Sequence, residues 1–220
     1  MSEIAIPKES LVTFPHRLIL FIARHWLFLI NTAVGLFVGL PFLAPLLMAA
    51  GYTTPAAFIY FLYRLTCHQL PQRSFFLGGP RATYSFDQIS AFTGETSFLD
   101  LTHRPITHPA LGYQVAFCQR DVAIYGTIFL AGVIFALLRH RLKPLSLKLY
   151  LLLIAPMAVD GLTQLLGWRE STWELRTITG ALFGLASVWL VYPYLEMGMG
   201  EIRADLEKGG GVEDFNVRSR

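Results

Sequence analysis

Long apolar runs alternate with shorter polar stretches along this chain. Four of the runs, at about residues 26–50, 122–138, 149–166 and 177–197, are rich in Leu, Ile, Val, Phe, Ala and Gly. Each is close to the roughly 20 residues that a helix needs to cross a hydrocarbon core about 30 Å thick. The pattern therefore predicts an all-α membrane protein, a polytopic bundle of about four transmembrane helices.

The composition agrees with the bilayer as the main solvent and partner. Of the 220 residues, 54% are hydrophobic and 15% are charged, and the mean hydropathy is +0.48, which is unlike a soluble domain. The formal net charge is +3, but the basic residues are spread along the chain and form no stripe. We therefore expect no nucleic acid as a partner.

Charged flanks predict the orientation of the bundle. The loop RHRLKPLSLK at residues 139–148 joins the second and third runs and holds four Lys or Arg residues. Loops of this kind stay in the cytoplasm. Lys8, Arg17 and Arg24 precede the first run, so this flank also faces inward. Both indications predict a multi-pass protein of the cell (inner or plasma) membrane with both termini in the cytoplasm.

The segments outside the runs divide the chain further. Residues 1–25 carry no recognisable cleaved signal peptide and are typical of a cytoplasmic amphipathic segment that leads into the first span. The bundle then occupies residues 26–197, and residues 198–220 are predicted to be a flexible cytoplasmic tail with a triple-glycine break.

The stretch between the first two spans must begin and end outside in this topology. Its apolar part, at about residues 55–66, is too short to span and predicts a re-entrant or surface helix with Pro55 in its first turn. Residues 78–112 are rich in Gly, Pro, Ser and Thr, and we expect an exoplasmic loop or small cap there.

Two motifs in this outer region hold metal-binding residue types. Cys67 and His68 are adjacent just past the short helix, and Cys118 and Asp121 stand where the second span begins. Cys, His and Asp all ligate zinc, so these four residues predict a possible zinc site. The alternative is a disulfide between Cys67 and Cys118, because both cysteines face an oxidising exterior in this topology.

A carboxylate lies within the third apolar run. Asp160 and Gln164 are one helical turn apart on the same face. A charge at that depth costs about 2.5–3.5 kcal/mol, so Asp160 should face the bundle interior and have a partner. Arg176 is the nearest candidate cation, with Arg120 and Arg169 as alternatives. The pair could serve a ligand site or simply lock helices together.

Small and aromatic residues in the spans predict packing rather than chemistry. Gly35 and Gly39 in the first span, and Gly180 and Gly184 in the last, form small-xxx-small pairs that allow close helix contact. Trp168 and Trp173 flank the short outer hairpin, as in an interfacial aromatic belt.

The spacing from Cys67 to Arg73 and Ser74 matches the Cys-x5-Arg-Ser pattern of cysteine-dependent phosphatases. Their loops are usually glycine-rich so that backbone amides converge on phosphate. Here Leu70 and Pro71 occupy the loop, and proline has no amide hydrogen. A hydrolase or phosphatase-like enzyme therefore stays an alternative.

Three motifs in order resemble the hallmarks of a family of uncharacterised small prokaryotic membrane proteins, classed only as a domain of unknown function. They fall on residues 67–75, 118–125 and 160–164, followed by Arg176, Thr179 and Gly180. In many members of that family a cysteine stands at the position of Asp121, which implies a zinc-like set. The resemblance covers about residues 55–197 and implies a membrane fold but no reaction.

These features converge on an outward-facing polar pocket. Its residues are Arg73, Arg120, Asp160, Gln164 and Arg176, beside the possible metal ligands. We expect such a pocket to bind a metal or an anionic lipid-linked ligand. The alternative from a different class is a structural or accessory subunit of a larger membrane complex, with other membrane protein subunits as partners.

Overall fold

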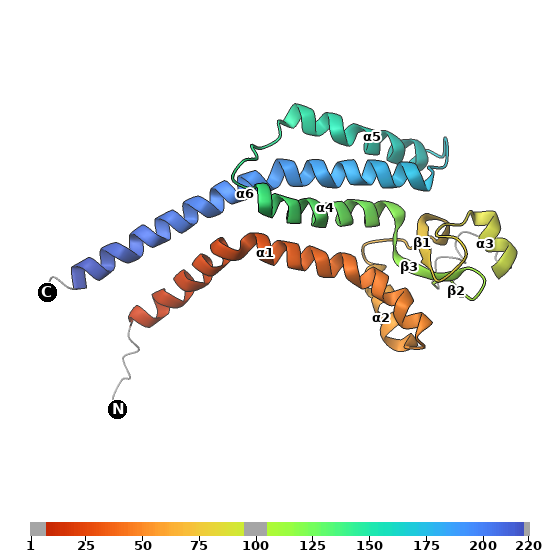
Figure 1. Cartoon of the computed structure of the whole chain (residues 1–220), viewed down its shortest axis with the longest axis horizontal. Coiled ribbons are helices and arrows are strands. Elements are labelled where there is room, and N and C mark those ends of the chain that lie inside the picture. Colours follow the sequence, from red (N-terminus) through yellow and green to blue (C-terminus); the bar gives the residue numbers. More distant parts are fainter. Residues whose placement is uncertain (1–7, 95–104, 218–220) are drawn as a thin grey trace.

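The computed structural model describes residues 8–94 and 105–217, and side chains are described only within residues 14–207 (Figure 1). Six α-helices, one short 3₁₀ helix and three strands occur in this part of the chain. They are α1 (Lys8–Ala49), α2 (Thr53–Tyr63), η1 (Pro71–Arg73), β1 (Ser74–Leu77), α3 (Phe86–Thr93), β2 (Thr107–His108), β3 (Gly112–Cys118), α4 (Gln119–Leu138), α5 (Leu147–Leu165) and α6 (Trp173–Val217).

Four helices are long and apolar enough to cross a membrane. The spanning segments are Phe14–Ala49, Gln119–Leu138, Leu147–Leu165 and Trp173–Glu207, in α1, α4, α5 and α6. Their outer faces carry many exposed large apolar side chains, as lipid contact requires. The predicted all-α bundle of four transmembrane helices is confirmed.

The spanning helices lie side by side, with α5 against α6, α6 against α4, and α4 beside α1 (Figure 1). Glycines let α6 approach α4 closely: a Cβ atom added to Gly184 would lie 2.5 Å from the carbonyl oxygen of Ile124, and one on Gly180 would lie 2.9 Å from that of Arg120. The predicted packing role of this pair is confirmed. In α1, only Gly35 meets a neighbour, the ring of Phe129.

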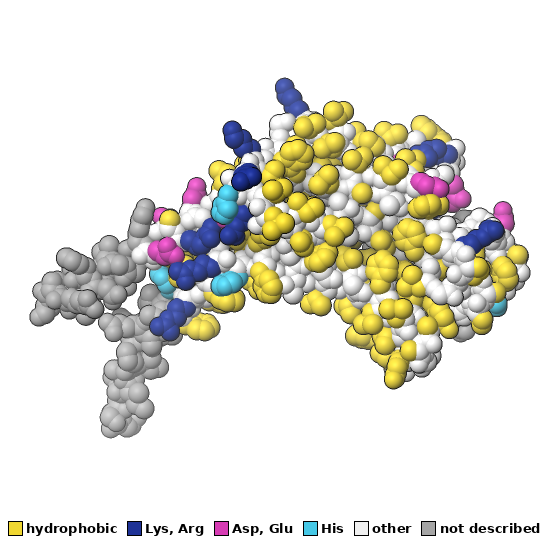
Figure 2. Space-filling view, viewed as in Figure 1, with side chains coloured by type: hydrophobic (Ala, Val, Ile, Leu, Met, Phe, Trp, Pro, Cys, Tyr) yellow, Lys and Arg dark blue, Asp and Glu magenta, His cyan; other side chains and the backbone are white. Residues whose placement is uncertain are grey.

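The beginning of α1 and the end of α6 lie at one end of the bundle, which we call the terminal end (Figure 1). Figure 2 shows Lys, Arg and His side chains gathered near this end, beside a broad hydrophobic middle. Here α6 continues as a helix to Val217, whereas the sequence predicted a separate flexible tail after residue 197. A contact with α1 supports the extension, because Arg24 pairs with Glu207 at 2.9 Å.

The opposite end, which we call the cap end, holds α2, α3 and the three strands (Figure 1). Helix α2 has 11 residues, too few to span. It buries Tyr60 and Tyr63 against the bundle and exposes Phe58 and Phe61. This arrangement matches the predicted surface helix.

The segment 78–112 is more ordered than the predicted loop, although residues 95–104 lie outside the described part. It contains α3 and β2, and the strands form an antiparallel sheet in the order β1-β3-β2. The sequence pattern missed this sheet because β3 is buried almost throughout, and the apolar and polar residues do not alternate.

Pairing of β1 with β3 brings the two Cys-containing motifs together. Ser74 lies opposite Cys118 in the register, so the residues before β1 meet the residues that begin α4. Gln114 of β3 stabilises the arrangement by donating to the carbonyl oxygen of Gln69 over 2.7 Å. Gln69 in turn donates to the carbonyl oxygen of Tyr60 over 2.8 Å.

Candidate functional site

A cavity of about 210 Å³ lies at the cap end, where the loop after α2 meets the first turns of α4 and α6 and the end of α5. Its wall is formed by Thr66, Cys67, His68, Gln69, Leu70, Arg73, Cys118, Arg120, Asp121, Gln164 and Arg176. We call it the arginine cavity. It contains every site residue that the sequence predicted except Asp160, which lies behind the wall.

Two thiols and a carboxylate meet on one side of the arginine cavity. The sulfur atoms of Cys67 and Cys118 and a carboxylate oxygen of Asp121 all lie within 4.8 Å of one another. Cys118 donates to Asp121 Oδ2 over 3.1 Å, and its own backbone amide donates to Cys67 Sγ over 3.3 Å. His68 is exposed and lines the same cavity, but it is outside this group.

The Cys67 thiol is held in its neutral form. Its hydrogen bond with Cys118, its burial and the nearby Asp121 carboxylate all raise the pKa of Cys67 well above the usual thiol range. A bound cation would reverse this effect by replacing the proton. Both cysteines carry free thiols in this structure, so the zinc site and the disulfide remain predictions.

Asp160 is buried with 1% of its surface exposed and is the centre of a polar network behind the cavity. Its carboxylate accepts hydrogen bonds from Arg120, from Arg169 at 2.6 Å and from Ser171 at 2.9 Å. Arg176, the first candidate that the sequence analysis named, is not its partner. The two alternatives, Arg120 and Arg169, are its partners. Arg120 reaches the carboxylate from α4, and the α5–α6 turn brings Arg169 and Ser171 to it.

Arg176 is 4% exposed and projects from α6 into the cavity wall. Its Nη1 donates to Gln119 Oε1 over 3.0 Å. Its Nη2 lies 3.0 Å from the side-chain amide of Gln164, whose oxygen accepts this bond in the amide orientation that satisfies both of its neighbours. Among the described residues, no carboxylate oxygen lies within 4.0 Å of this guanidinium, and its Nε has no partner.

Arg73 lies beside Arg176. The same amide oxygen of Gln164 accepts from Arg73 Nη2 over 3.1 Å, so one neutral oxygen bridges two guanidinium groups. Glu170 lies 3.7 Å from Arg73 and is largely exposed. The wall of the arginine cavity that holds Arg73 and Arg176 therefore carries more positive charge than the nearby Glu170 carboxylate neutralises.

Sequence reasoning missed two residues of this site. Ser171 and Gln119 are buried and hold Asp160 and Arg176. Neither has a distinctive spacing, although Gln119 follows Cys118 directly. Only the folded hairpin and the β3–α4 junction bring them into place.

Comparisons with known proteins agree with the predicted resemblance. A family described as "Predicted membrane protein (DUF2085)" matches residues 107–190. An uncharacterized protein of Methanocaldococcus jannaschii is 32% identical over 165 residues, which cover 71% of this chain and 84% of that protein. The chain belongs to this family.

A second relative of this DUF2085 protein, an uncharacterized protein of Methanothermobacter thermautotrophicus, is 36% identical over 86 residues, 38% of this chain and 78% of that protein. No solved structure matches significantly. The DUF2085 match spans Cys118, Asp160 and Arg176 but begins after Cys67 and Arg73. The family thus identifies a membrane protein, and the geometry must supply the functional argument.

Proposed function

We propose that this protein binds an anionic, lipid-linked ligand with a phosphate or carboxylate group in the arginine cavity. One observation carries the proposal: Arg176 is buried beside Arg73, and its described partners are two neutral amide oxygens. A buried charge without a counter-charge is costly, so an anion from outside the chain is the expected partner.

The contrast with Asp160 supports this interpretation. The buried carboxylate of Asp160 has its counter-charges within the chain, since Arg120 and Arg169 both contact it. Arg176 receives no such partner in the described residues. A guanidinium presents paired N–H donors that match phosphate or carboxylate oxygens, and the N-terminus of α4 adds favourable partial charge nearby.

The position of the cavity favours a ligand at the membrane surface. It follows directly after α2, whose exposed Phe58 and Phe61 suit contact with lipid. We propose that the cap end faces the exterior of the cell membrane and that both termini are cytoplasmic, as the basic terminal end favours (Figure 2).

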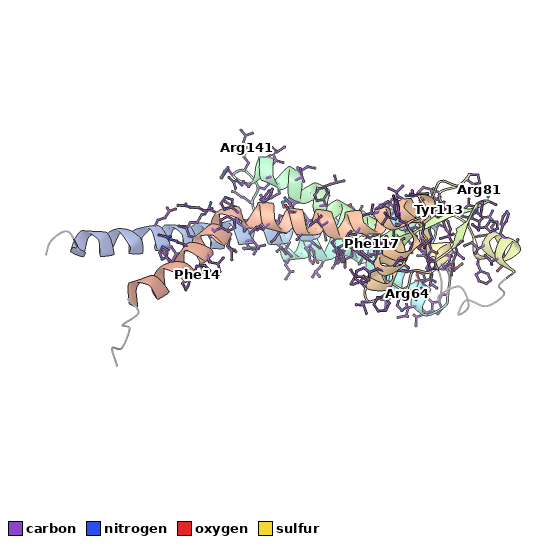
Figure 3. The ribbon with its side chains drawn as sticks, turned by 90° about the horizontal axis from the view of Figure 1, so that it is seen from below. Phe14, Arg64, Arg81, Tyr113, Phe117 and Arg141 are labelled. Atoms are coloured by element: carbon purple, nitrogen blue, oxygen red, sulfur yellow. The ribbon has the colours of Figure 1, made fainter. Side chains whose placement is uncertain are left out.

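Titration of the detergent-purified protein with inorganic phosphate at constant ionic strength tests the anion site. We expect saturable binding that weakens at least about tenfold in Arg176→Gln and in Arg73→Gln, because each removes a charge-assisted contact. Arg141→Gln is the matched control, since Arg141 lies far from the cap end (Figure 3). Inorganic phosphate that fails to bind, or that binds all variants equally, would overturn the proposal.

Zinc binding is a second candidate function, favoured by the convergence of Cys67, Cys118 and Asp121 within 4.8 Å. His68 or a water would complete a four-coordinate shell. Metal analysis, with thiol labelling before and after reduction, separates this site from a disulfide. Stoichiometric zinc that is lost in Cys118→Ser supports the site; thiols that label only after reduction, without zinc, contradict it.

A phosphatase-like reaction is less well supported. Cys67 and Arg73 do line one cavity, as the phosphatase spacing predicts. A nucleophilic cysteine needs a lowered pKa, however, and the surroundings of Cys67 raise it. A role as an accessory subunit would instead appear as fixed stoichiometric partners on purification, with no phosphate binding.

A further inference from the structure

A second and larger cavity, of about 750 Å³, adjoins the arginine cavity at the cap end. It lies between the loop and first turn of α3 and the beginning of α6, and we call it the cap cavity. Its walls include Gln72, Arg81, Gln119, Glu170, Trp173 and Glu174.

Arg176 belongs to the walls of both cavities. Its Nη2 bonds to Gln164, which lines the arginine cavity, whereas its Nη1 bonds to Gln119, which lines the cap cavity. Arg73 of the first cavity also pairs with Glu170 of the second at 3.7 Å. A single ligand that contacts the Arg176 guanidinium can therefore extend into both cavities.

Gln72 in the wall of the cap cavity has an unsatisfied side chain. It is 8% exposed, and neither its amide oxygen nor its amide nitrogen has a hydrogen-bond partner in the described part of the chain. Buried polar atoms are nearly always paired, so an unpaired donor and acceptor on one amide indicate a missing partner. A hydroxyl group, which donates and accepts, satisfies both kinds of atom.

The two cavities differ in charge. Arg73, Arg120 and Arg176 outnumber Asp121 in the arginine cavity. In the cap cavity, Glu170 and Glu174 balance Arg81 and Arg176. The first cavity favours an anion, and the second offers acceptors for neutral hydroxyl groups.

An aromatic surface completes the cap cavity. Trp173 is 44% exposed, and its ring packs against Phe75 in a T-shaped arrangement, with the ring centroids 6.4 Å apart. An indole ring with amide and carboxylate groups nearby suits the mixed apolar and hydroxylated surface of a sugar or polyol.

We propose that the ligand is a phosphate ester of a sugar or polyol. The phosphate group lies in the arginine cavity against Arg73 and Arg176, and the hydroxylated part lies in the cap cavity against Gln72 and Trp173. This inference rests on the proposed anion site and adds the class of molecule that carries the anion.

Binding of a hexose 1-phosphate and of glycerol 1-phosphate, each compared with methyl phosphate, tests the inference on the full chain in detergent. At least one of the two should bind about tenfold tighter than methyl phosphate, the gain expected from one or two added hydrogen bonds. Gln72→Met and Trp173→Ala should remove this gain and leave methyl phosphate binding unchanged. Trp168→Ala, which changes the other tryptophan of the same hairpin, should keep it.

The outcomes separate this inference from the anion site. If methyl phosphate binds but neither ester binds tighter, or if Gln72→Met keeps the gain, the sugar or polyol assignment is overturned and the anion site stands. If no phosphate compound binds, the anion site fails as well. A thermal-stability measurement on each variant confirms that it is folded.

A further pair of probes identifies the source of the ester. Phosphatidylinositol in mixed micelles and soluble inositol 1-phosphate carry the same polyol phosphate. If the lipid binds at least about tenfold tighter, the ligand is a membrane lipid headgroup, because α2 and the bilayer add apolar contacts. Equal binding assigns a soluble ester and overturns the lipid-linked part of the proposed function. Binding of neither polyol phosphate restricts the ligand to the sugar esters.

Discussion

Asp160 is the residue on which the cap end depends for its internal charge balance. It is 1% exposed within a spanning helix and accepts bonds from side chains on α4 and on the α5–α6 turn. Removing the carboxylate would leave its partners without a counter-charge, although both arginine side chains are partly exposed. Arg120 and Arg169 would lose it together.

Asp160→Asn should therefore destabilise the protein by about 1–3 kcal/mol, because solvent partly screens the two arginines. The amide keeps the shape and one acceptor oxygen, but it removes the charge that neutralises two guanidinium groups. Thermal unfolding in detergent measures the effect. Glu170→Gln is the control, because the Glu170 carboxylate is largely exposed and should change stability by less than about 1 kcal/mol. Equal stability of the two variants would contradict a structural role for Asp160.

The sequence predicted that Asp160 needs a partner, but its first candidate, Arg176, was wrong, and the two alternatives are the partners. The free-energy cost of a carboxylate in the membrane depends on residue type and depth, so the sequence alone predicts that Asp160 needs a partner. The choice depends on the path of the α5–α6 turn, where Arg169 and Ser171 return to the carboxylate. Arg176, one helical turn into the last span, instead turns to the amides of Gln119 and Gln164.

At the scale of elements, apolar length predicted the four spans, and the short length of α2 predicted a surface helix. The sheet was not predictable in the same way. Its strands have 4, 2 and 7 residues, and their pairing spans distant parts of the chain. This pairing is what sets Arg73 beside α4, so the sequence could name the site residues but not their arrangement.

The contact between α4 and α6 gives a prediction at this scale. Gly184→Ala should destabilise the bundle by about 1–3 kcal/mol, because the new methyl group would lie 2.5 Å from the backbone oxygen of Ile124. Gly126→Ala in α4 is the matched control, since no atom lies within 4 Å of its added Cβ and alanine is the better helix former. Thermal unfolding of both variants in the same detergent provides the comparison; a neutral Gly184→Ala would exclude a tight α4–α6 contact.

At the scale of the whole molecule, the two ends of the bundle differ in chemistry. The basic side chains, Arg141 among them, gather towards the terminal end (Figures 2 and 3). The cap end carries both cavities. Basic flanks are retained in the cytoplasm, so the ligand should approach from outside. An inverted protein would present the same cavities to cytoplasmic phosphate esters, and the proposed ligand would then be a different molecule.

Labelling of single cysteines in intact cells decides between these orientations. In a variant with both native cysteines changed to serine, Asp87→Cys in the first turn of α3 should react with a membrane-impermeant maleimide, because this position is exposed at the cap end. Lys143→Cys, exposed in the basic loop, should react only after the membrane is opened. The reverse pattern would place the cap end inside, and the search for the phosphate ester would then move to the cytoplasm.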